Sequence, residues 1–578
     1  MNDLSNDLLI TEFLGKNLSG PFTIPSGIVT CTPSIIQRVF DTMPEVGVLT
    51  TKSIGPEPRL GYREPILAQH QPGYFTNAVG LTNPGAERSA ELMAALNVPA
   101  DRFLLVSIFG ASIEEYVAVA KIMAPHSDGL ELNLSCPHAK GYGMAMGQDP
   151  ELVKEIVEAV KAAVDIPVIA KLTPNVPNIG EIAAAARDGG VDAICAINTT
   201  GPESFSSHGH EILSNGKGGV SGKGILDIAL RCVDEIHASV VDCPIIACGG
   251  ISSAENVRDF QAAGATIIGI GSALIGMNTD EIAAYFRQLS RDLQPGVVTN
   301  SESESEPDTR ATATTSAVES AAAENAEALV RYDIDMSFSP VTLVKNERIT
   351  DDISILTFDR KVGVQAGEFI FLWIPGLGEK PFSVLTDDPF CLVVIDLGVF
   401  TNALMTLEPG AEAYVRGPHG NAVAPPEDAK IMLVAGGTGL AAVYQIARDF
   451  AKSNGSAELF LGARTAERLY FLDECTAVSE LHIATDDGSR GHHGVVTELL
   501  RKRLEELTTD ECRNLIFYNC GPAAMVHAAE VVEKEFCDGS QIYNGVDYLT
   551  KCGVGICGAC DSADGRRLCV DGPFLDAS

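Results

Sequence analysis

Long apolar runs and an excess of basic residues are both missing from this sequence. No run of about eighteen apolar residues occurs, so no membrane-spanning helix is expected. The first residues, MNDLSNDLLITEFLGKNL, lack a basic segment followed by an apolar core, which argues against a secretory signal peptide. The formal net charge is −36, from 41 Lys and Arg against 77 Asp and Glu, and such a chain repels phosphate backbones. We therefore expect neither a membrane nor a nucleic-acid partner.

A disulfide framework is also missing, although the chain has 15 cysteines. Outside the C-terminal segment they are scattered, many of them in apolar runs such as DAICAIN and PIIACGG. Scattered thiols of this kind are typical of a reducing compartment. The sequence therefore predicts a cytoplasmic protein.

Large apolar side chains are nearly absent from residues 296–333, a stretch rich in Ser, Thr, Ala and Glu. Such a segment buries too little surface to offset the entropy of ordering it, so it is interpreted as a flexible linker. The composition on either side of it changes. We expect a first body over 1–295, and then three further units over 334–428, 429–545 and 546–578.

The first body alternates short apolar strands with Ala-rich helical stretches. Strand-like runs include FLLVSIF, GLELNLS, PVIAKLT, AICAINT and PIIACGG, and helical ones include PELVKEIVEAVKAAV. Repeated β-then-α units with fully apolar strands predict a parallel (β/α)8 TIM barrel, with a doubly wound sheet as the alternative. Such barrels carry their chemistry at the carboxyl ends of the strands.

Residues suited to catalysis recur at these strand ends, and one more, Asn77, lies in an expected loop. Each alone has an ordinary interpretation, as a packed cysteine, a surface lysine or a turn asparagine. Their joint placement favours a binding site, and two glycine-rich ends, expected to be the seventh and eighth strands, suit a phosphate. The candidates are Lys52, Asn77, Asn133, Cys136, Lys171, Asn198 and Thr199, followed by Gly249, Gly250, Gly271 and Ser272.

This first body resembles class 1 dihydroorotate dehydrogenase through the ordered motifs TTKSIGPEPRLGY, NAVGLTNPG, ELNLSCP, VIAKLTPN, INTTGP, GGVSGKGI and CGGISSAENV. The resemblance implies an FMN-binding barrel that oxidises dihydroorotate to orotate in pyrimidine synthesis, and a homodimer through the barrel. The sequence departs from the family at His138, where Asn is usual, and at Lys223, where Pro is common.

The same resemblance implies roles for individual residues. Cys136 would be the catalytic base, and Lys171 would stabilise negative charge on reduced flavin. The substrate would be bound by Lys52, Asn77, Asn133, Asn198 and Thr199. FMN would be bound by Lys52, Lys171, Gly222, Gly249, Gly250, Gly271 and Ser272. His208 and His210 lie in a Gly/Ser-rich stretch that we interpret as a solvated loop.

The second half of the chain changes character. The runs SILTFD, EFIFLWI, CLVVIDL and AEAYVRG predict a small antiparallel β-barrel over 334–428, and IMLVAGGTGLAAVYQIARDF begins a βαβ nucleotide-binding fold over 429–545. The motifs resemble ferredoxin-reductase-like proteins, which implies FAD at Lys380, Pro381, Phe382, Ser383, Gly398 and Thr401, with Lys380 where Arg is usual. NAD would be bound by Gly436, Gly437, Thr438, Gly439, Asp487, Cys520 and Gly521.

The C-terminal segment reads C-x4-C-x2-C-x8-C, formed by Cys552, Cys557, Cys560 and Cys569. The first three match the plant-type 2Fe–2S spacing, and the glycines between them permit a tight loop. A zinc site is the alternative, although zinc sites usually show paired C-x2-4-C units. The C-x8-C interval is shorter than the interval that is commoner in electron-transfer subunits with this cysteine pattern.

Taken together, 337–578 resembles the electron-transfer subunit of class 1B dihydroorotate dehydrogenase, fused here to the catalytic barrel. That implies electron flow from FMN through 2Fe–2S and FAD to NAD. Two alternatives stay open. One is a dihydropyrimidine oxidoreductase acting on uracil or thymine with the same cofactors. The other is a redox-responsive binding module without turnover.

Overall fold

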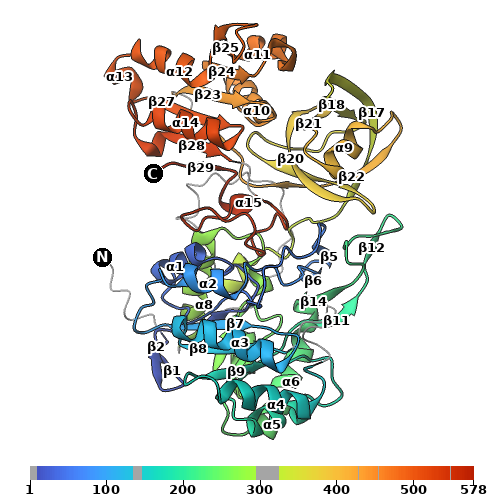
Figure 1. Ribbon diagram of the computed structural model, residues 1–578, viewed down its shortest axis with the longest axis vertical. Helices are drawn as coiled ribbons and strands as arrows, with labels where there is room; N and C mark the ends of the chain where they lie inside the picture. The colour runs from blue at the N-terminus through green and yellow to red at the C-terminus, as the bar shows by residue number, and fades with distance from the viewer. Residues whose placement is uncertain (1–8, 135–145, 295–324, 427–428, 454, 547–548) are drawn as a thin grey trace.

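The structure is a computed structural model that describes residues 9–134, 146–294, 325–426, 429–453, 455–546 and 549–578. Figure 1 shows three folded parts. The N-terminal barrel lies at one end, and a yellow antiparallel barrel and an orange-red α/β sheet lie side by side at the other. The dark red C-terminal segment with α15 (Leu568–Asp571) lies between these ends.

The N-terminal part is a closed barrel of parallel strands in the order β10-β15-β16-β3-β4-β7-β8-β9. In chain order these strands are β3 (Phe22–Ile24), β4 (Val48–Thr50), β7 (Phe103–Ile108), β8 (Gly129–Asn133), β9 (Val168–Lys171), β10 (Ala193–Ala196), β15 (Ile245–Cys248) and β16 (Ile267–Gly269). The TIM-barrel prediction is confirmed, and CGGIS and GIGSAL do follow the seventh and eighth strands.

Eight helices cover this barrel among the described residues. They are α1 (Pro33–Thr42), α2 (Ala86–Met93), α3 (Ile113–Met123), α4 (Pro150–Lys161), α5 (Ile179–Asp188), α6 (Leu226–Ser239), α7 (Ala254–Ala262) and α8 (Thr279–Leu293). Several of them start at a side-chain cap, such as Asp149 on α4 and the Asn278–Glu281 capping box on α8. The strands are apolar on both faces because one side packs on these helices and the other fills the barrel.

Smaller elements decorate the barrel. A hairpin of β1 (Thr11–Phe13) and β2 (Lys16–Leu18) lies at its amino end, and a sheet runs in the order β11 (Thr200–Glu203), β14 (Gly218–Gly222), β6 (Tyr74–Asn77), β5 (Leu67–Gln71). The hairpin of β12 (Ser206–Ser207) and β13 (His210–Glu211) carries His208 and His210. It contacts the second barrel, because His208 Nε2 lies 2.7 Å from the carbonyl oxygen of Phe338. His208 and His210 are both exposed, as expected for a solvated loop, and His208 adds this one contact to the second barrel.

Residues 325–333, the described end of the expected linker, pack on the first barrel. Ala326 is fully buried, and its N–H donates to Asp292 Oδ2 at 2.7 Å. The side chains of Leu329 and Val330 also join the core between barrel and helices. These residues therefore form part of the barrel surface, because a few apolar side chains suffice to hold so short a segment.

The second part is a closed antiparallel barrel in the order β17-β18-β21-β20-β19-β22. Its elements are β17 (Ser339–Thr350), β18 (Ile353–Phe358), β19 (Phe369–Ile374), β20 (Gly378–Asp387), β21 (Phe390–Ile395), α9 (Val399–Met405) and β22 (Glu412–His419). The predicted antiparallel barrel is confirmed.

The third part is a seven-stranded sheet in the order β26-β25-β24-β23-β27-β28-β29. Its strands are β23 (Lys430–Gly436), β24 (Ala457–Ala463), β25 (Glu480–Thr485), β26 (His492–His493), β27 (Leu515–Cys520), β28 (Ile542–Gly545) and β29 (Phe574–Asp576). Its helices are α10 (Gly439–Lys452), α11 (Leu472–Val478), α12 (Val496–Glu505), α13 (Thr509–Cys512) and α14 (Ala523–Glu533). Strand β29 pairs antiparallel with β28, so the chain's C-terminal segment returns to this sheet.

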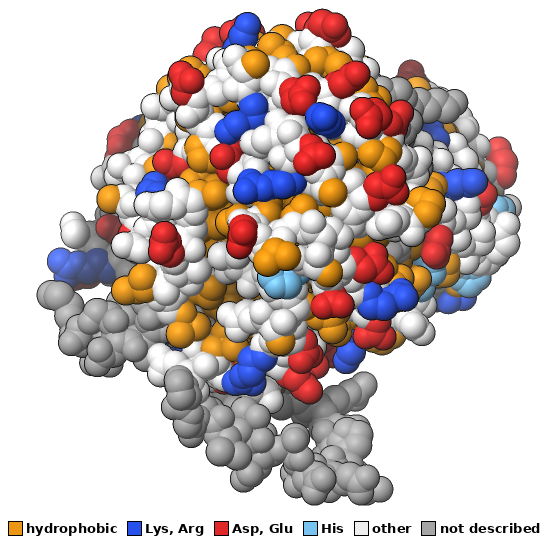
Figure 2. Space-filling view, turned by 90° about the horizontal axis from the view of Figure 1, so that it is seen from below, with side chains coloured by type: hydrophobic (Ala, Val, Ile, Leu, Met, Phe, Trp, Pro, Cys, Tyr) orange, Lys and Arg blue, Asp and Glu red, His pale blue; other side chains and the backbone are white. Residues whose placement is uncertain are grey.

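Acidic and basic side chains are interspersed over the end of the first barrel that Figure 2 shows. Within the described part of the chain, no helix is long and apolar enough to cross a bilayer.

Candidate functional site

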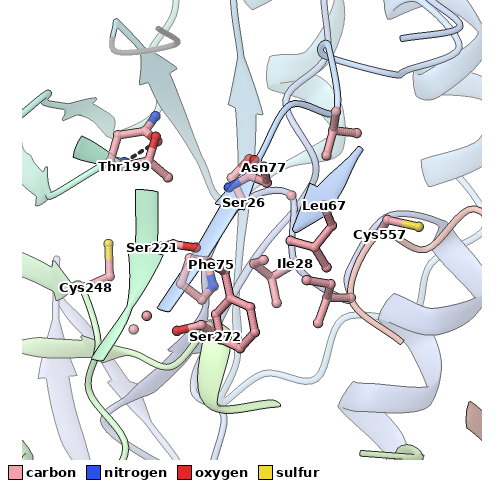
Figure 3. A pocket seen from close by; sticks show the side chains of 18 of the residues that line it. Ser26, Ile28, Leu67, Phe75, Asn77, Thr199, Ser221, Cys248, Ser272 and Cys557 are labelled. Atoms are coloured by element: carbon pink, nitrogen blue, oxygen red, sulfur yellow. Dashed lines mark hydrogen bonds between the residues drawn. The ribbon is translucent and has the colours of Figure 1, made fainter. Parts of the chain in front are cut away.

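One cavity at the carboxyl ends of the first barrel's strands collects the predicted residues (Figure 3). Its lining includes Lys52, Asn77, Asn133, Lys171, Asn198, Thr199, Gly222, Gly249, Gly250, Gly271 and Ser272. Cys552 and Cys557 of the C-terminal segment also line it, and Figure 3 shows Cys557 across the pocket from Cys248. The cavity is therefore closed partly by the cysteine-rich segment.

Lys171 is a buried cation at the end of β9. Its Nζ lies 3.5 Å from Glu131 Oε1 on the neighbouring strand β8, and both side chains are almost fully buried. Burial alone would lower the pKa of Lys171, but the Glu131 carboxylate reverses this and raises it far above its usual value. Lys171 therefore stays protonated at the cavity, with part of its charge balanced by Glu131.

Two asparagine amides face each other across the strand ends. Asn133 Nδ2 donates to Ser53 Oγ at 2.8 Å, and Ser53 in turn contacts Ser107 Oγ at 2.8 Å. Asn198 Nδ2 lies 3.5 Å from Asn133 Oδ1. This chain of hydroxyls and amides fixes which way each amide points, as recognition of a ring with both donors and acceptors requires.

The glycine-rich loops approach each other through their backbones. A Cβ on Gly250 would lie 2.6 Å from the carbonyl oxygen of Gly222, and one on Gly222 would lie 2.2 Å from that of Gly73. Nearby, burial raises the pKa of Tyr332, while hydrogen bonding to the hydroxyls of Ser252 and Ser272 lowers it. Glycine loops whose backbones approach this closely suit a phosphate, so these residues fit FMN.

Cys136, the predicted base, lies outside the described residues, as does His138. Leu134, just before them, is described and fully buried. The chain is therefore buried up to Leu134, two residues before Cys136 in the sequence.

A second cavity lies between the antiparallel barrel and the α/β sheet. It is lined by the predicted FAD residues Lys380, Pro381, Phe382, Ser383, Gly398 and Thr401, and by Gly436, Gly437, Thr438, Gly439, Cys520 and Gly521 of the predicted NAD set. A Cβ on Gly439 would lie 2.0 Å from the carbonyl oxygen of Cys520, so the loop after β23 lies directly on the end of β27. The close glycine backbones fit a dinucleotide.

Asp487 is not brought to this cavity. It lies in an exposed turn after β25, where its carboxylate accepts a hydrogen bond from Ser489 N at 3.0 Å. The hydrogen bonds from Ser489 lower the pKa of Asp487. In the structure this residue stabilises its own turn.

The four C-terminal cysteines are all buried. Cys560 Sγ and Cys569 Sγ are 3.4 Å apart, and Gly555 N donates to Cys569 Sγ at 3.2 Å. The neighbouring thiols of Cys557 and Cys569 hold the pKa of Cys552 well below its usual range. Four buried cysteine side chains, one of them accepting a backbone N–H bond, fit a metal cluster.

The spacing of these sulfurs bears on the nuclearity of the site. A single tetrahedral zinc would need all four sulfurs within about 3.8 Å of one another. In the described part of the chain, one group of three or more His, Cys, Asp or Glu residues has its ligand atoms all within 4.8 Å of one another. That group is Glu458, Glu480 and His482, and it contains no cysteine. The cysteines therefore include the close pair Cys560 and Cys569, and no three of the four have their sulfurs all within 4.8 Å of one another in this structure.

The cysteine segment is bonded to both bodies. Toward the first barrel, Lys52 Nζ donates to the carbonyl oxygen of Cys557 at 3.4 Å, and Gly276 N donates to that of Val554 at 3.0 Å. Toward the second, the buried Arg416 donates to the carbonyl oxygen of Cys552 at 3.0 Å. The segment is thus the physical connection between the two cavities.

Several residues of these sites were missed by sequence reasoning. Ser53 directly follows the predicted Lys52, and Glu131 is a lone acid in an apolar strand, so both carried a detectable signal. Arg63 and Glu64 of the first barrel reach the second body, and Arg416 pairs with Glu379. Such long-range partners leave no local signal.

Comparisons with known proteins agree with both halves. The dihydroorotate dehydrogenase family matches residues 8–293, and the oxidoreductase NAD-binding domain matches residues 433–531. The catalytic subunit of dihydroorotate dehydrogenase B (NAD(+)) from Pyrococcus horikoshii is 44% identical over 46% of this chain and 86% of its own. That of Methanocaldococcus jannaschii is 41% identical over 50% of this chain and 96% of its own. A solved structure of an NADH-dependent reduced ferredoxin–NADP oxidoreductase matches 42% of this chain and 90% of its own, with TM-score 0.38 and 26% identity.

Proposed function

The chain belongs to the dihydroorotate dehydrogenase family, and from this premise we propose that it oxidises (S)-dihydroorotate to orotate in pyrimidine synthesis, with NAD as acceptor. The observation that carries the proposal is the charge of the first cavity. Among the described residues that line it, the charged ones are Lys52 and Lys171. In a chain of net charge −36, such a pocket favours an anionic ring over an uncharged dihydropyrimidine.

Within this proposal, Asn77, Asn133, Asn198 and Thr199 bind the amides and carboxylate of the substrate. Cys136 would take the proton from carbon five, and bound FMN would supply the acceptor for the hydride from carbon six. Lys171 stabilises the negative charge that then develops, since Glu131 keeps it protonated. FMN supplies two-electron chemistry when bound at the glycine loops.

We further propose that electrons pass from FMN through a 2Fe–2S cluster and FAD to NAD. Two hydride reactions in separate cavities need a carrier between them, and the cysteine segment touches both. Cys552 and Cys557 line the first cavity, while Thr550 and Leu568 line the second. The homodimer through the barrel stays a prediction.

Anaerobic titration of the pure holoprotein tests this function. Dihydroorotate should bleach the flavin at concentrations where dihydrouracil does not, and iron, sulfide, FMN and FAD should be recovered from the chain. A stronger response to dihydrouracil, or zinc in place of iron, would contradict the proposal. The variant C136A should retain FMN but lose almost all bleaching, while C557S should lose cluster absorbance and NAD reduction and keep the bleaching.

A further inference from the structure

The second cavity is built from both bodies. Arg63 belongs to the first barrel, in the segment that follows β4, yet it lines this cavity beside Gly378–Ser383. The two bodies meet here through their backbones, since Glu379 N donates to the carbonyl oxygen of Glu64 at 3.3 Å. A Cβ on Gly378 would lie 3.2 Å from Arg63 Cδ, so the arginine stem lies directly on this glycine.

The charged side chains of this cavity differ in whether they already have a partner of opposite charge. Its described cations are Arg63 and Lys380, and its described acid is Glu379. Glu379 is held by Arg416 through both carboxylate oxygens, at 2.8 and 2.9 Å. Lys380 Nζ is held by Glu64 Oε2 at 3.0 Å, so much of its charge is already neutralised by a buried carboxylate of the first barrel.

Arg63 differs from Lys380 in this respect. Its guanidinium donates to the carbonyl oxygen of Gly376 at 3.0 Å and, within the described part of the chain, forms no ion pair. Four further N–H donors remain in a planar fork, which matches a phosphate group better than an ammonium does. A dinucleotide flavin brings a pyrophosphate with two negative charges into this cavity.

We propose that Arg63 binds the pyrophosphate of FAD, so that the dihydroorotate-oxidising barrel completes the flavin site of the second body. This inference rests on the proposed function, which places FAD in the second cavity. It implies that tight FAD binding requires the two bodies to be docked. Lys380 then mainly stabilises the interface between the two bodies, through its ion pair with Glu64.

The test uses the full-length protein stripped of FAD, with FAD affinity measured by fluorescence at several salt concentrations. Arg63→Gln removes the charge but keeps a neutral donor, Arg63→Lys keeps the charge, and Arg88→Gln is the control. Arg88 is an exposed barrel arginine that pairs with Glu91. FMN content is measured on each sample, because it reports whether the barrel is intact.

Arg63→Gln should raise the dissociation constant of FAD by roughly tenfold or more, as expected for loss of a charge-assisted hydrogen bond. The remaining binding should depend less on salt, FMN content should be unchanged, Arg63→Lys should be intermediate, and Arg88→Gln should match wild type. Wild-type affinity in Arg63→Gln would overturn the inference. An equal loss in the Gln and Lys variants with unaltered salt dependence would also overturn it, since that indicates a role only in shaping the Gly376 turn. Wild-type protein that takes up no FAD would instead remove the proposed FAD site itself.

Discussion

Lys52 Nζ lies 3.4 Å from the carbonyl oxygen of Cys557 and 3.9 Å from Cys31 Sγ. One side chain of the first barrel therefore touches both its own cavity and a proposed cluster ligand from the end of the chain. Lys52 is thus one of the residues that join the first cavity to the cysteine segment, together with Gly276 and Val29. Small changes at this contact should affect electron transfer more than substrate oxidation.

Gly558 offers a way to widen that contact. A Cβ there would lie 2.4 Å from Cys31 Cβ, and the left-handed φ of +66° adds about 1 kcal/mol of strain for alanine. Gly558→Ala should push the cysteine loop off the barrel and slow NAD reduction by at least tenfold, with flavin bleaching by dihydroorotate spared, as measured by anaerobic stopped flow.

The double variant Gly558→Ala/Cys31→Gly is the matched control, because it removes the atom that the new methyl group meets. It should recover most of the lost NAD reduction. Equal rates in the single and double variants would show that the approach of these two residues is not what limits transfer.

Glu64 joins three parts of the chain. Its carboxylate lies 3.0 Å from Lys380 Nζ and 3.2 Å from Lys551 Nζ. Lys551 is buried, so Glu64→Gln leaves a buried ammonium without its counter-charge and should destabilise docking by about 3 kcal/mol. The reporter is Trp373, the single tryptophan of the chain, which packs in one cluster with Ile212 and Leu213 of the first barrel.

The denaturation midpoint followed by Trp373 emission should fall in Glu64→Gln and not in Glu57→Gln, an exposed neighbour. Burial opposes ionisation of Glu64, but its hydrogen bonds and the two lysines lower its pKa below the usual 4.5. A carboxyl group whose pKa is lower in the folded protein than in the unfolded chain stabilises the folded protein above pH 4.5. This stabilisation is lost as the pH falls through the pKa of Glu64 in the folded protein. Wild type should therefore lose docking in acid more steeply than the variant. If the denaturation midpoints of wild type and Glu64→Gln fall equally as the pH is lowered, Glu64 does not hold the two bodies together.

Much of the fold follows from local patterns in the sequence. The apolar runs around Val168–Lys171 and Ile245–Cys248 predicted strands of a parallel barrel, because the strands of such a barrel are buried on both faces. The carboxyl ends of all strands in such a barrel lie at the same end of it. The residues that line the first cavity could therefore be predicted from their positions at the strand ends. The loop glycines followed from the close backbone approach that a phosphate needs.

The missing features depend on contacts between distant segments. Arg63 and Glu64 resemble surface charges in the sequence, and only docking of a segment more than 300 residues away gives them partners, as in the Glu64–Lys380 pair. Asp487 matched a motif, yet its side chain bonds to its own turn. Local sequence describes the two bodies well, but not the seam between them.

Glu131 should control the protonation of Lys171. In Glu131→Gln the counter-charge is lost, and burial then lowers the pKa of Lys171, because a desolvated ammonium is disfavoured. The rate of flavin bleaching by dihydroorotate should therefore fall at a lower pH in the variant, while wild type keeps its rate further into alkali. Stopped-flow profiles from pH 6 to about 10 measure this. Glu91→Gln, on the surface of α2, is the control, and a profile of Glu131→Gln identical to wild type would remove Glu131 from this role.

Glu533 is a fully buried carboxyl on α14, and its one described donor is Asn519 Nδ2 at 2.8 Å. Burial raises its pKa to about 8. The folded protein thus holds a proton that the unfolded chain releases above pH 4.5, so stability falls as the pH rises from 4.5 to about 8. Glu533→Gln keeps the shape without the charge and should stabilise the α/β sheet domain by about 2–4 kcal/mol at pH 8 and hardly at all at pH 5. Urea unfolding at both pH values measures this, with exposed Glu505→Gln as the control. A stabilisation that is the same at both pH values would mean that packing, and not the buried charge, separates Gln from Glu at this position.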